Sequence, residues 1–282
     1  MSYTNPQALV TTKRLAKNVN DLNTIVLDGT YHLPTVGRSA KTEFTSQHIE
    51  GAVFFDIDDI CDKDSSLPHM LPSADLFSKK VGDLGIANDM HIVVYDVYGM
   101  QSAARTWWMF KVFGHDKVSI LSGGLPKWIK EGNTASSVPS VRTPSTYICN
   151  KRGELVRNLE DVFANINNGK EQIIDARSKG RFNGLEPEPR EGMRSGHMPG
   201  SISLPFTELL NPEDKTYLTG LEIKEKIKEA GIDLNKPIIT TCGSGVTACS
   251  LSLGLFLIGK EDVAVYDGSW SEWGALQNTP VI

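Results

Sequence analysis

Short apolar segments of three to five residues recur along the chain, and each is bounded by polar or turn-forming residues. Continuous apolar runs of this length are typical of strands that are buried on both faces of a parallel sheet. They lie at 25–28, 91–95, 118–121, 173–175, 237–241 and 263–266. The segments between them have helical patterns, so we predict βαβ crossovers. The fold class is therefore α/β, with mostly parallel sheets that carry helices on both faces.

The same landmarks occur twice, with a period close to half the chain. An Asp ends an apolar strand at 28 and 175, and a His-x-x-Gly turn begins at 48 and 197. Further strands end at 95 and 241, and each copy closes with a Trp, at 128 and 273. The four separations are 147, 149, 146 and 145 residues, which indicates a duplicated domain. We predict domains over 1–135 and 156–282, joined by a linker over 136–155 that is rich in small and polar residues.

Local signals place two of the helices. A short amphipathic helix is expected over 9–22, ahead of the first strand. Thr219 and Glu222 have the spacing of a capping box, so a helix should follow as far as Ala230. Gly231 then supplies the helix stop.

Composition and charge exclude several classes of function. The 282 residues are 40% hydrophobic and 22% charged, with a net charge of −5, so we expect a globular protein without a nucleic-acid partner. No apolar run approaches the roughly 20 residues that cross a bilayer, and no signal-peptide core begins the chain. We therefore predict a cytoplasmic protein that does not bind membranes.

Cofactor motifs are missing as well. The four cysteines form neither a C-x-x-C pair nor a zinc spacing. No G-x-G-x-x-G stretch or P-loop lysine occurs, so we expect no metal, nucleotide or flavin. Free thiols in a reducing compartment fit this cysteine usage best.

One cysteine lies where a parallel sheet places its chemistry. The strand 237–241 leads directly into Cys242-Gly-Ser-Gly-Val-Thr247, and an apolar helix follows from near Val246. Gly243 and Gly245 allow successive backbone N–H groups to form an anion-binding nest, to which the helix adds the positive end of its dipole. These features favour a thiolate at Cys242, with a buried structural cysteine as the alternative.

The other three cysteines lack this context. Cys249 falls on the apolar helix after the loop, where packing is favoured over a role as a resolving thiol. Cys61 and Cys149 are interpreted as structural.

Several motifs together resemble the tandem-domain rhodaneses, from about Leu22 to Leu276. They are Asp-Ala-Arg177, Gly-His197-Met-Pro-Gly200, the Cys242 loop ending in Gly-Val-Thr-Ala248, and Asp267-Gly-x-x-x-x-Trp273. The resemblance implies two rhodanese-like domains and a sulfurtransferase that carries sulfur on Cys242. The loop Cys-Gly-Ser-Gly-Val-Thr is similar to that of the mercaptopyruvate-specific branch, whereas thiosulfate-specific relatives carry basic residues after the cysteine.

Donor recognition must then come from outside the loop, because residues 243–247 carry no charge. The segment 180–190 resembles the family segment whose two arginines hold the carboxylate and keto oxygen of the donor, which implies this role for Arg181 and Arg190. Guanidinium suits a carboxylate because its donors are paired in one plane. The alternative for each arginine is a surface or salt-bridge residue. The predicted substrate-binding set is completed by loop residues Gly243, Gly245, Val246 and Thr247, while Arg177 and Arg194 are expected to be structural.

The first domain is expected to contribute to the same site. The resemblance groups Ser244 with His69 and Asp58 as a proton-relay set that polarises the donor carbonyl, although a His beside Pro68 could equally be a loop residue. The first-domain counterpart of Cys242 is Asp96, and a carboxylate cannot carry sulfane sulfur. That domain should therefore be catalytically silent and cover the site.

The predicted reaction has two steps. Cys242 takes sulfur from 3-mercaptopyruvate, a small-molecule donor, and releases pyruvate. The persulfide then passes to a thiol, a thioredoxin-like protein or cyanide. The alternatives are a thiosulfate sulfurtransferase and a persulfide carrier that another protein loads. A phosphatase is disfavoured, since its loop would need Arg at position 248, which is Ala.

Overall fold

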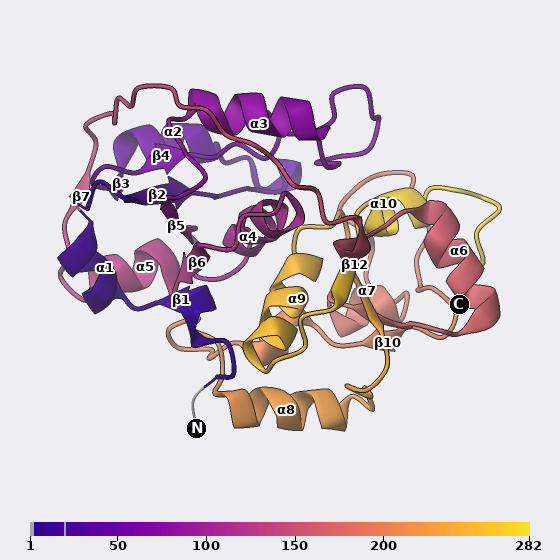
Figure 1. Cartoon of the computed structure of the whole chain (residues 1–282). Helices are drawn as coiled ribbons and strands as arrows, with labels where there is room; N and C mark the ends of the chain where they lie inside the picture. Colours follow the sequence, from indigo (N-terminus) through magenta and orange to yellow (C-terminus); the bar gives the residue numbers. More distant parts are fainter. Residues whose placement is uncertain (1–2, 20) are drawn as a thin grey trace.

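The computed structural model describes residues 3–19 and 21–282, and it contains two α/β domains built on the same plan (Figure 1). Both main sheets have five parallel strands. The first has the order β1-β6-β5-β2-β4 and the second β8-β12-β11-β9-β10, so the strands correspond one to one. This confirms the duplicated domain and the mostly parallel sheets predicted from the sequence.

The strand bounds follow. The first sheet contains β1 (Leu9–Val10), β2 (Thr24–Asp28), β4 (Val53–Phe54), β5 (His91–Tyr95) and β6 (Val118–Leu121). The second contains β8 (Val156–Arg157), β9 (Gln172–Asp175), β10 (Ile202–Ser203), β11 (Ile238–Thr241) and β12 (Val263–Tyr266). A small antiparallel pair joins β3 (His48–Ile49) to β7 (Ala135–Ser136).

Ten α-helices are present in the described part of the chain. They are α1 (Thr12–Asn18), α2 (Ala40–Ser46), α3 (Ala74–Asp83), α4 (Ala103–Val112), α5 (Gly124–Lys130), α6 (Leu159–Asn168), α7 (Lys179–Phe182), α8 (Gly220–Glu229), α9 (Ala248–Leu257) and α10 (Ser269–Trp273). Four 3-10 helices occupy Pro6–Ala8, Pro34–Val36, Gly153–Leu155 and Phe206–Leu209.

Helices cover both faces of each sheet, and successive strand residues therefore enter different hydrophobic cores. In β5, Ile92 and Val94 join one core, whereas Val93 and Tyr95 join another with residues of α1 and α5. In β11, Ile238 and Ile239 divide in the same way. This alternation is the period of two that a strand imposes on its side chains. It explains why the strands are apolar at nearly every position.

The predicted helix over 9–22 is wrong at both ends. Leu9–Val10 pairs in parallel with β6, and the helix covers only Thr12–Asn18. The Thr11 side chain accepts a hydrogen bond from Arg14 N at 3.2 Å and so starts the helix after the strand. Sheet pairing outweighed the amphipathic pattern at the first two residues.

Two helices predicted in the second domain are present. The Thr219–Glu222 capping box is present, α8 runs over Gly220–Glu229, and Gly231 has a φ of +76°. The helix after Cys242 begins at Ala248, two residues later than expected, because residues 243–247 remain in the loop.

The segment predicted as a linker lies along the first domain. Residues 137–152 contain no helix or strand. Ser145 N donates to Gly82 O at 2.9 Å, Asn150 N donates to Phe113 O at 3.0 Å, and Tyr147 is buried. The connection is thus fixed to the first domain before it reaches β8.

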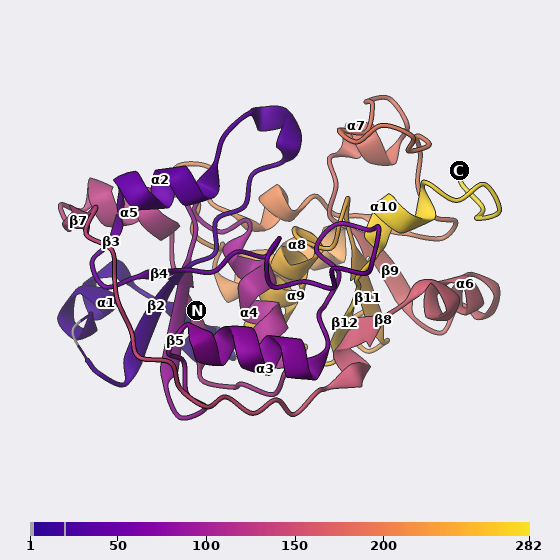
Figure 2. The ribbon, with the colours of Figure 1, turned by 90° about the horizontal axis from the view of Figure 1, so that it is seen from above.

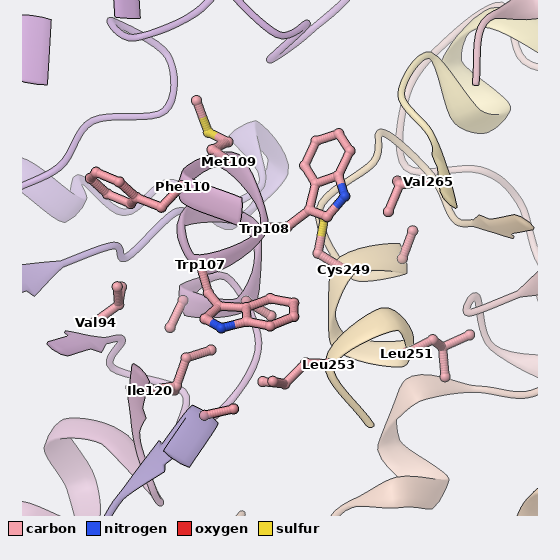
Figure 3. Close-up of a cluster of buried hydrophobic side chains, with 14 of the residues drawn as sticks. Val94, Trp107, Trp108, Met109, Phe110, Ile120, Cys249, Leu251, Leu253 and Val265 are labelled. Atoms are coloured by element: carbon pink, nitrogen blue, oxygen red, sulfur yellow. The ribbon is translucent and has the colours of Figure 1, made fainter. Parts of the chain in front are cut away.

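Helices α4 and α9 join the domains. Figure 3 shows Trp107 and Trp108 of α4 beside Cys249 and Leu253 of α9, and one hydrophobic core contains buried residues of both domains. The Trp107 ring also packs edge-on against Phe256, with centroids 5.3 Å apart. An interface this apolar fixes the two domains relative to each other. Each helix begins at the loop after its domain's central strand, so their packing also sets how those two loops face each other.

A buried carboxyl at the end of β2 makes stability depend on pH. Asp28 is 1% exposed, and burial raises its pKa to about 6, with a smaller contribution from the Asp96 carboxylate. Between pH 3.8 and about 6 the folded protein holds a proton that the unfolded chain releases. The contribution of the Asp28 carboxyl to the free energy of unfolding is therefore fully present below pH 3.8 and is lost as the pH rises through about 6.

We expect Asp28→Asn to remove this pH dependence. The raised pKa corresponds to about 3 kcal/mol, so the variant should gain up to that amount over the wild type between pH 4 and 7. Urea unfolding of both proteins across this range measures the difference. A difference in unfolding free energy that stays constant with pH would contradict the assignment.

Candidate active site

Cys242 lies at the carboxyl end of β11, the central strand of the second sheet. Its side chain is 2% exposed. Its backbone N–H donates to Ser269 Oγ at 3.2 Å, and its carbonyl accepts from Trp270 N at 3.0 Å. The backbone of the cysteine is therefore anchored to α10 on both sides, as a fixed nucleophile requires.

The two glycines of the loop have different steric surroundings. Gly245 has a φ of +73°, and a Cβ there would lie 2.7 Å from Asp267 O. A Cβ on Gly243 would lie 3.0 Å from Arg181 Nη2. In the described part of the chain, the backbone N–H groups of 243–247 donate to no protein acceptor. The loop therefore presents free donors around the cysteine.

The corresponding loop of the first domain shows what such donors hold. The Asp96 carboxylate accepts four backbone N–H bonds, from Tyr98 at 2.9 Å, Gly99 at 2.7 Å, and Gln101 and Ala103 at 2.8 Å each. Asp96 follows β5 as Cys242 follows β11, although its loop is one residue longer before the helix. The duplicated loop is thus an anion cradle, occupied in the first domain by the protein's own carboxylate.

A cavity of about 270 Å³ opens beside the cysteine and is lined by both domains. Figure 2 shows the segment leading into α2 and the segment around α7 rising from the same side of the molecule. All the predicted loop residues except Gly245 line the cavity, as do both predicted arginines. The lining residues are Tyr31, Leu33, Gln101, Ala176, Arg177, Ser178, Arg181, Pro189, Arg190, Phe206, Cys242, Gly243, Ser244, Val246 and Thr247.

Arg181 is neutralised by a carboxylate that the sequence did not reveal. Its guanidinium meets Glu188, with Nη2 to Oε2 at 2.5 Å and Nε to both oxygens at 3.2 Å. Glu188 also accepts from Arg177 Nη1 at 2.7 Å, and Arg177 pairs with Asp175 at 2.7 Å. These two arginines and two carboxylates have no net charge. Arg177 is fully buried and its guanidinium lies 4.1 Å from the Trp270 ring, consistent with the predicted structural role.

Arg190 has a neutral partner. Its Nη2 donates to the hydroxyl of Tyr31 at 3.2 Å, and within residues 3–19 and 21–282 its guanidinium forms no salt bridge. Of the three arginines that line the cavity, Arg177 and Arg181 form salt bridges, and Arg190 forms none among the described residues. Arg194, in contrast, donates to the backbone oxygens of Trp273, Gly274 and Thr279 outside the cavity.

His69 and Asp58 lie together in the first domain. His69 Nδ1 is 2.6 Å from Asp58 Oδ1, although the oxygen lies off the direction of a straight hydrogen bond. Burial lowers the pKa of His69, against the opposing effect of Asp58, so the neutral ring is favoured. His69 has a φ of +58°, a strained conformation for this residue. Ser244 lines the cavity, but no hydrogen bond between it and His69 occurs in the described residues.

A buried ion pair between the domains lies beneath the loop, and sequence reasoning missed it. Arg105 Nη1 of α4 is 2.7 Å from Asp267 Oδ1, and both side chains are buried. Arg105 also donates to the backbone oxygens of Gly245 and His69, and its guanidinium lies 4.7 Å from the Trp108 ring. Asp267 Oδ2 accepts from Leu71 N at 2.8 Å. One side chain therefore contacts both the cysteine loop and the segment that carries His69.

The remaining cysteines have ordinary packing contacts, and all four are free. Cys249 donates to Gly245 O at 3.1 Å, and burial raises the pKa of its thiol. Cys61 donates to Asp58 O, and Cys149 accepts from Ser78 Oγ, both at 3.1 Å. These contacts agree with the structural interpretation.

Two features are absent from the part of the chain that the structure describes. No cluster of three or more His, Cys, Asp or Glu side chains there is arranged to hold a metal ion. None of the helices described is long and apolar enough to cross a membrane.

Breaking the Arg105–Asp267 pair should destabilise the protein strongly. Arg105→Met leaves a buried carboxylate without its counter-charge, for which we expect a loss of about 3–5 kcal/mol in urea unfolding. The double variant Arg105→Met/Asp267→Leu removes both charges and should recover a large part of that loss. Equal losses in the single and double variants would show that the charges are not coupled.

Comparisons with known proteins agree on one family. The rhodanese-like domain family matches residues 11–131 and 158–276. Human 3-mercaptopyruvate sulfurtransferase is 44% identical over 250 residues, 88% of this chain and 84% of the human protein. A mitochondrial thiosulfate/3-mercaptopyruvate sulfurtransferase of Arabidopsis thaliana is 40% identical over 301 residues, 99% of this chain and 79% of the plant protein. The crystal structure of SseA from Escherichia coli, a 3-mercaptopyruvate sulfotransferase, superposes with a TM-score of 0.85 at 37% identity, covering 94% of this chain and 99% of SseA.

Proposed function

The chain belongs to the rhodanese family, and from this premise we propose that it is a sulfurtransferase that moves sulfur from 3-mercaptopyruvate to a thiol acceptor through a persulfide on Cys242. One observation carries the choice of donor. The loop after the cysteine has no charge, while the cavity beside it contains Arg190, which forms no salt bridge with any described residue. A donor with a single carboxylate, placed a few atoms from its sulfur, matches this arrangement.

In the first step the Cys242 thiolate attacks the sulfur of 3-mercaptopyruvate. The S–S bond forms as the donor's C–S bond breaks, and the bonding pair passes to carbon as the enolate of pyruvate. Protonation of that carbon gives pyruvate. Arg190 binds the donor's carboxylate, and Arg181 donates to its keto oxygen.

The negative charge that develops on the keto oxygen needs nearby donors. Ser244 lies in the cavity lining, and Arg181 lies against Gly243. His69 faces the Asp58 carboxylate through Nδ1, so its neutral ring presents Nε2 as an acceptor, and we assign it the role of orienting the Ser244 hydroxyl. Because these groups are buried or partly buried, their hydrogen bonds to the enolate are stronger than they would be in water.

In the second step the persulfide is discharged. An acceptor thiolate attacks the outer sulfur, the S–S bond breaks, and Cys242 leaves as the thiolate. Until then the outer sulfur carries negative charge that the N–H groups of 243–247 can bind, as their counterparts bind Asp96. A thioredoxin-like protein or cyanide could serve as the acceptor.

Thiosulfate is the competing donor, and the plant relative is named for both donors. Thiosulfate is a compact dianion whose sulfonate would be held by cations beside the cysteine, and residues 243–247 provide none. We therefore propose thiosulfate as a slow donor only. A cytoplasmic location remains a prediction, since the same relative is mitochondrial.

The proposed reaction predicts a specific covalent product. Wild-type protein incubated with 3-mercaptopyruvate should gain one sulfur atom on Cys242, with one pyruvate released for each persulfide formed. Mass spectrometry and a pyruvate assay measure both quantities. Cys242→Ser should abolish both, whereas Cys249→Ser should retain them because Cys249 is a packing residue. A persulfide formed without pyruvate would instead favour a carrier that another protein loads.

Arg190 should matter for the first half-reaction only. Arg190→Ala removes a charge-assisted contact to the donor's carboxylate, so KM for 3-mercaptopyruvate should rise about 10- to 100-fold. The rate at which a small thiol discharges a preformed persulfide should change less than about threefold, because Arg190 is proposed to bind the donor and not the acceptor. If persulfide formation and persulfide discharge were impaired equally, the role of Arg190 in donor binding would be contradicted.

A further inference from the structure

Tyr31 belongs to the first domain but lines the cavity beside Cys242. Its hydroxyl accepts from Arg190 Nη2 at 3.2 Å. Its ring packs edge-on against His69, with centroids 4.4 Å apart and planes at 70°. Its backbone N–H donates to Ser102 Oγ at 3.1 Å, at the start of α4. One side chain therefore touches the donor-binding arginine and the histidine, and its backbone is tied to the helix that joins the domains.

The two donor-binding arginines are held by different chemistry. Arg181 is held by Glu188, which cancels its charge. Arg190 is held by a phenol, whose pKa burial raises to about 12, so it stays neutral at physiological pH. A neutral acceptor orients a guanidinium and leaves its full charge for a ligand. A carboxylate at position 31 would compete with the donor's carboxylate for the same N–H groups.

We propose that Tyr31 is a positioning residue that aims Arg190 at the donor's carboxylate, so that donor recognition is shared between the two domains. This inference rests on the proposed function. It assigns to the first domain, which has Asp96 at the position of Cys242, a role in choosing the donor as well as in covering the site. Because Tyr31 acts through Arg190, its contribution should appear in donor binding and not in the discharge of sulfur.

Tyr31→Phe isolates the hydroxyl, since it keeps the ring against His69. Loss of one hydrogen bond to Arg190 should raise KM for 3-mercaptopyruvate about 3- to 10-fold, with kcat within about twofold of wild type. Tyr98→Phe is the matched control. It removes another first-domain hydroxyl, which lies 2.6 Å from His32 Nδ1, and Tyr98 does not line the cavity. Its KM should equal that of the wild type.

Three readouts decide the proposal: KM, kcat and the melting temperature of each variant. A KM for Tyr31→Phe equal to that of the wild type would overturn it. So would a rise in KM accompanied by similar falls in kcat and melting temperature in both tyrosine variants, which would indicate a structural role alone. If the wild type itself fails to use 3-mercaptopyruvate, the proposed function fails and this inference falls with it. The first result leaves the proposed function standing, so the two failures are distinguishable.

Discussion

The ion pair between Arg105 and Asp267 is the contact on which the geometry of the site depends. Both charges are removed from water, so each is stable there only because the other is present. Arg105 comes from α4 of the first domain, yet it contacts the backbone of the cysteine loop at Gly245 and of the opposite segment at His69. The apolar packing of α4 on α9 brings the domains together, and this pair fixes the register in which they meet.

The duplication explains why one domain carries chemistry and the other does not. Corresponding loops follow the central strand of each sheet, and in the first domain four backbone N–H groups donate to Asp96. In the first domain the buried Asp96 side chain occupies this position and accepts all four N–H bonds. In the second domain Cys242 takes that position, so the cradle can hold a thiolate or a persulfide. The first domain contributes Tyr31 to the cavity lining, and its Arg105 contacts the cysteine loop at Gly245.

The sequence predicted the parts of this arrangement that have local signals. Each apolar strand, each repeated landmark and the glycine loop after Cys242 is a short contiguous pattern in the sequence. The fold predictions that rested on these patterns were confirmed. The first helix was misplaced because Leu9–Val10 pairs with β6, more than 100 residues away. Glu188, Tyr31 and Arg105 were missed for the same reason, since their roles depend on partners brought near by folding. Glu188 had a weak signal, because it lies within the same segment as Arg181 and Arg190.

The central claim is that a neutral loop and Arg190, which forms no salt bridge with the described residues, select a carboxylate-bearing donor. The ratio of kcat/KM for the two candidate donors tests it most directly. With cyanide as the common acceptor, thiocyanate formation from 3-mercaptopyruvate and from thiosulfate can be measured on the same wild-type preparation. We expect 3-mercaptopyruvate to be preferred by at least about 100-fold, the difference that roughly 3 kcal/mol of donor recognition provides. Equal values, or a preference for thiosulfate, would contradict this account of donor selection while leaving the fold and the nucleophile in place.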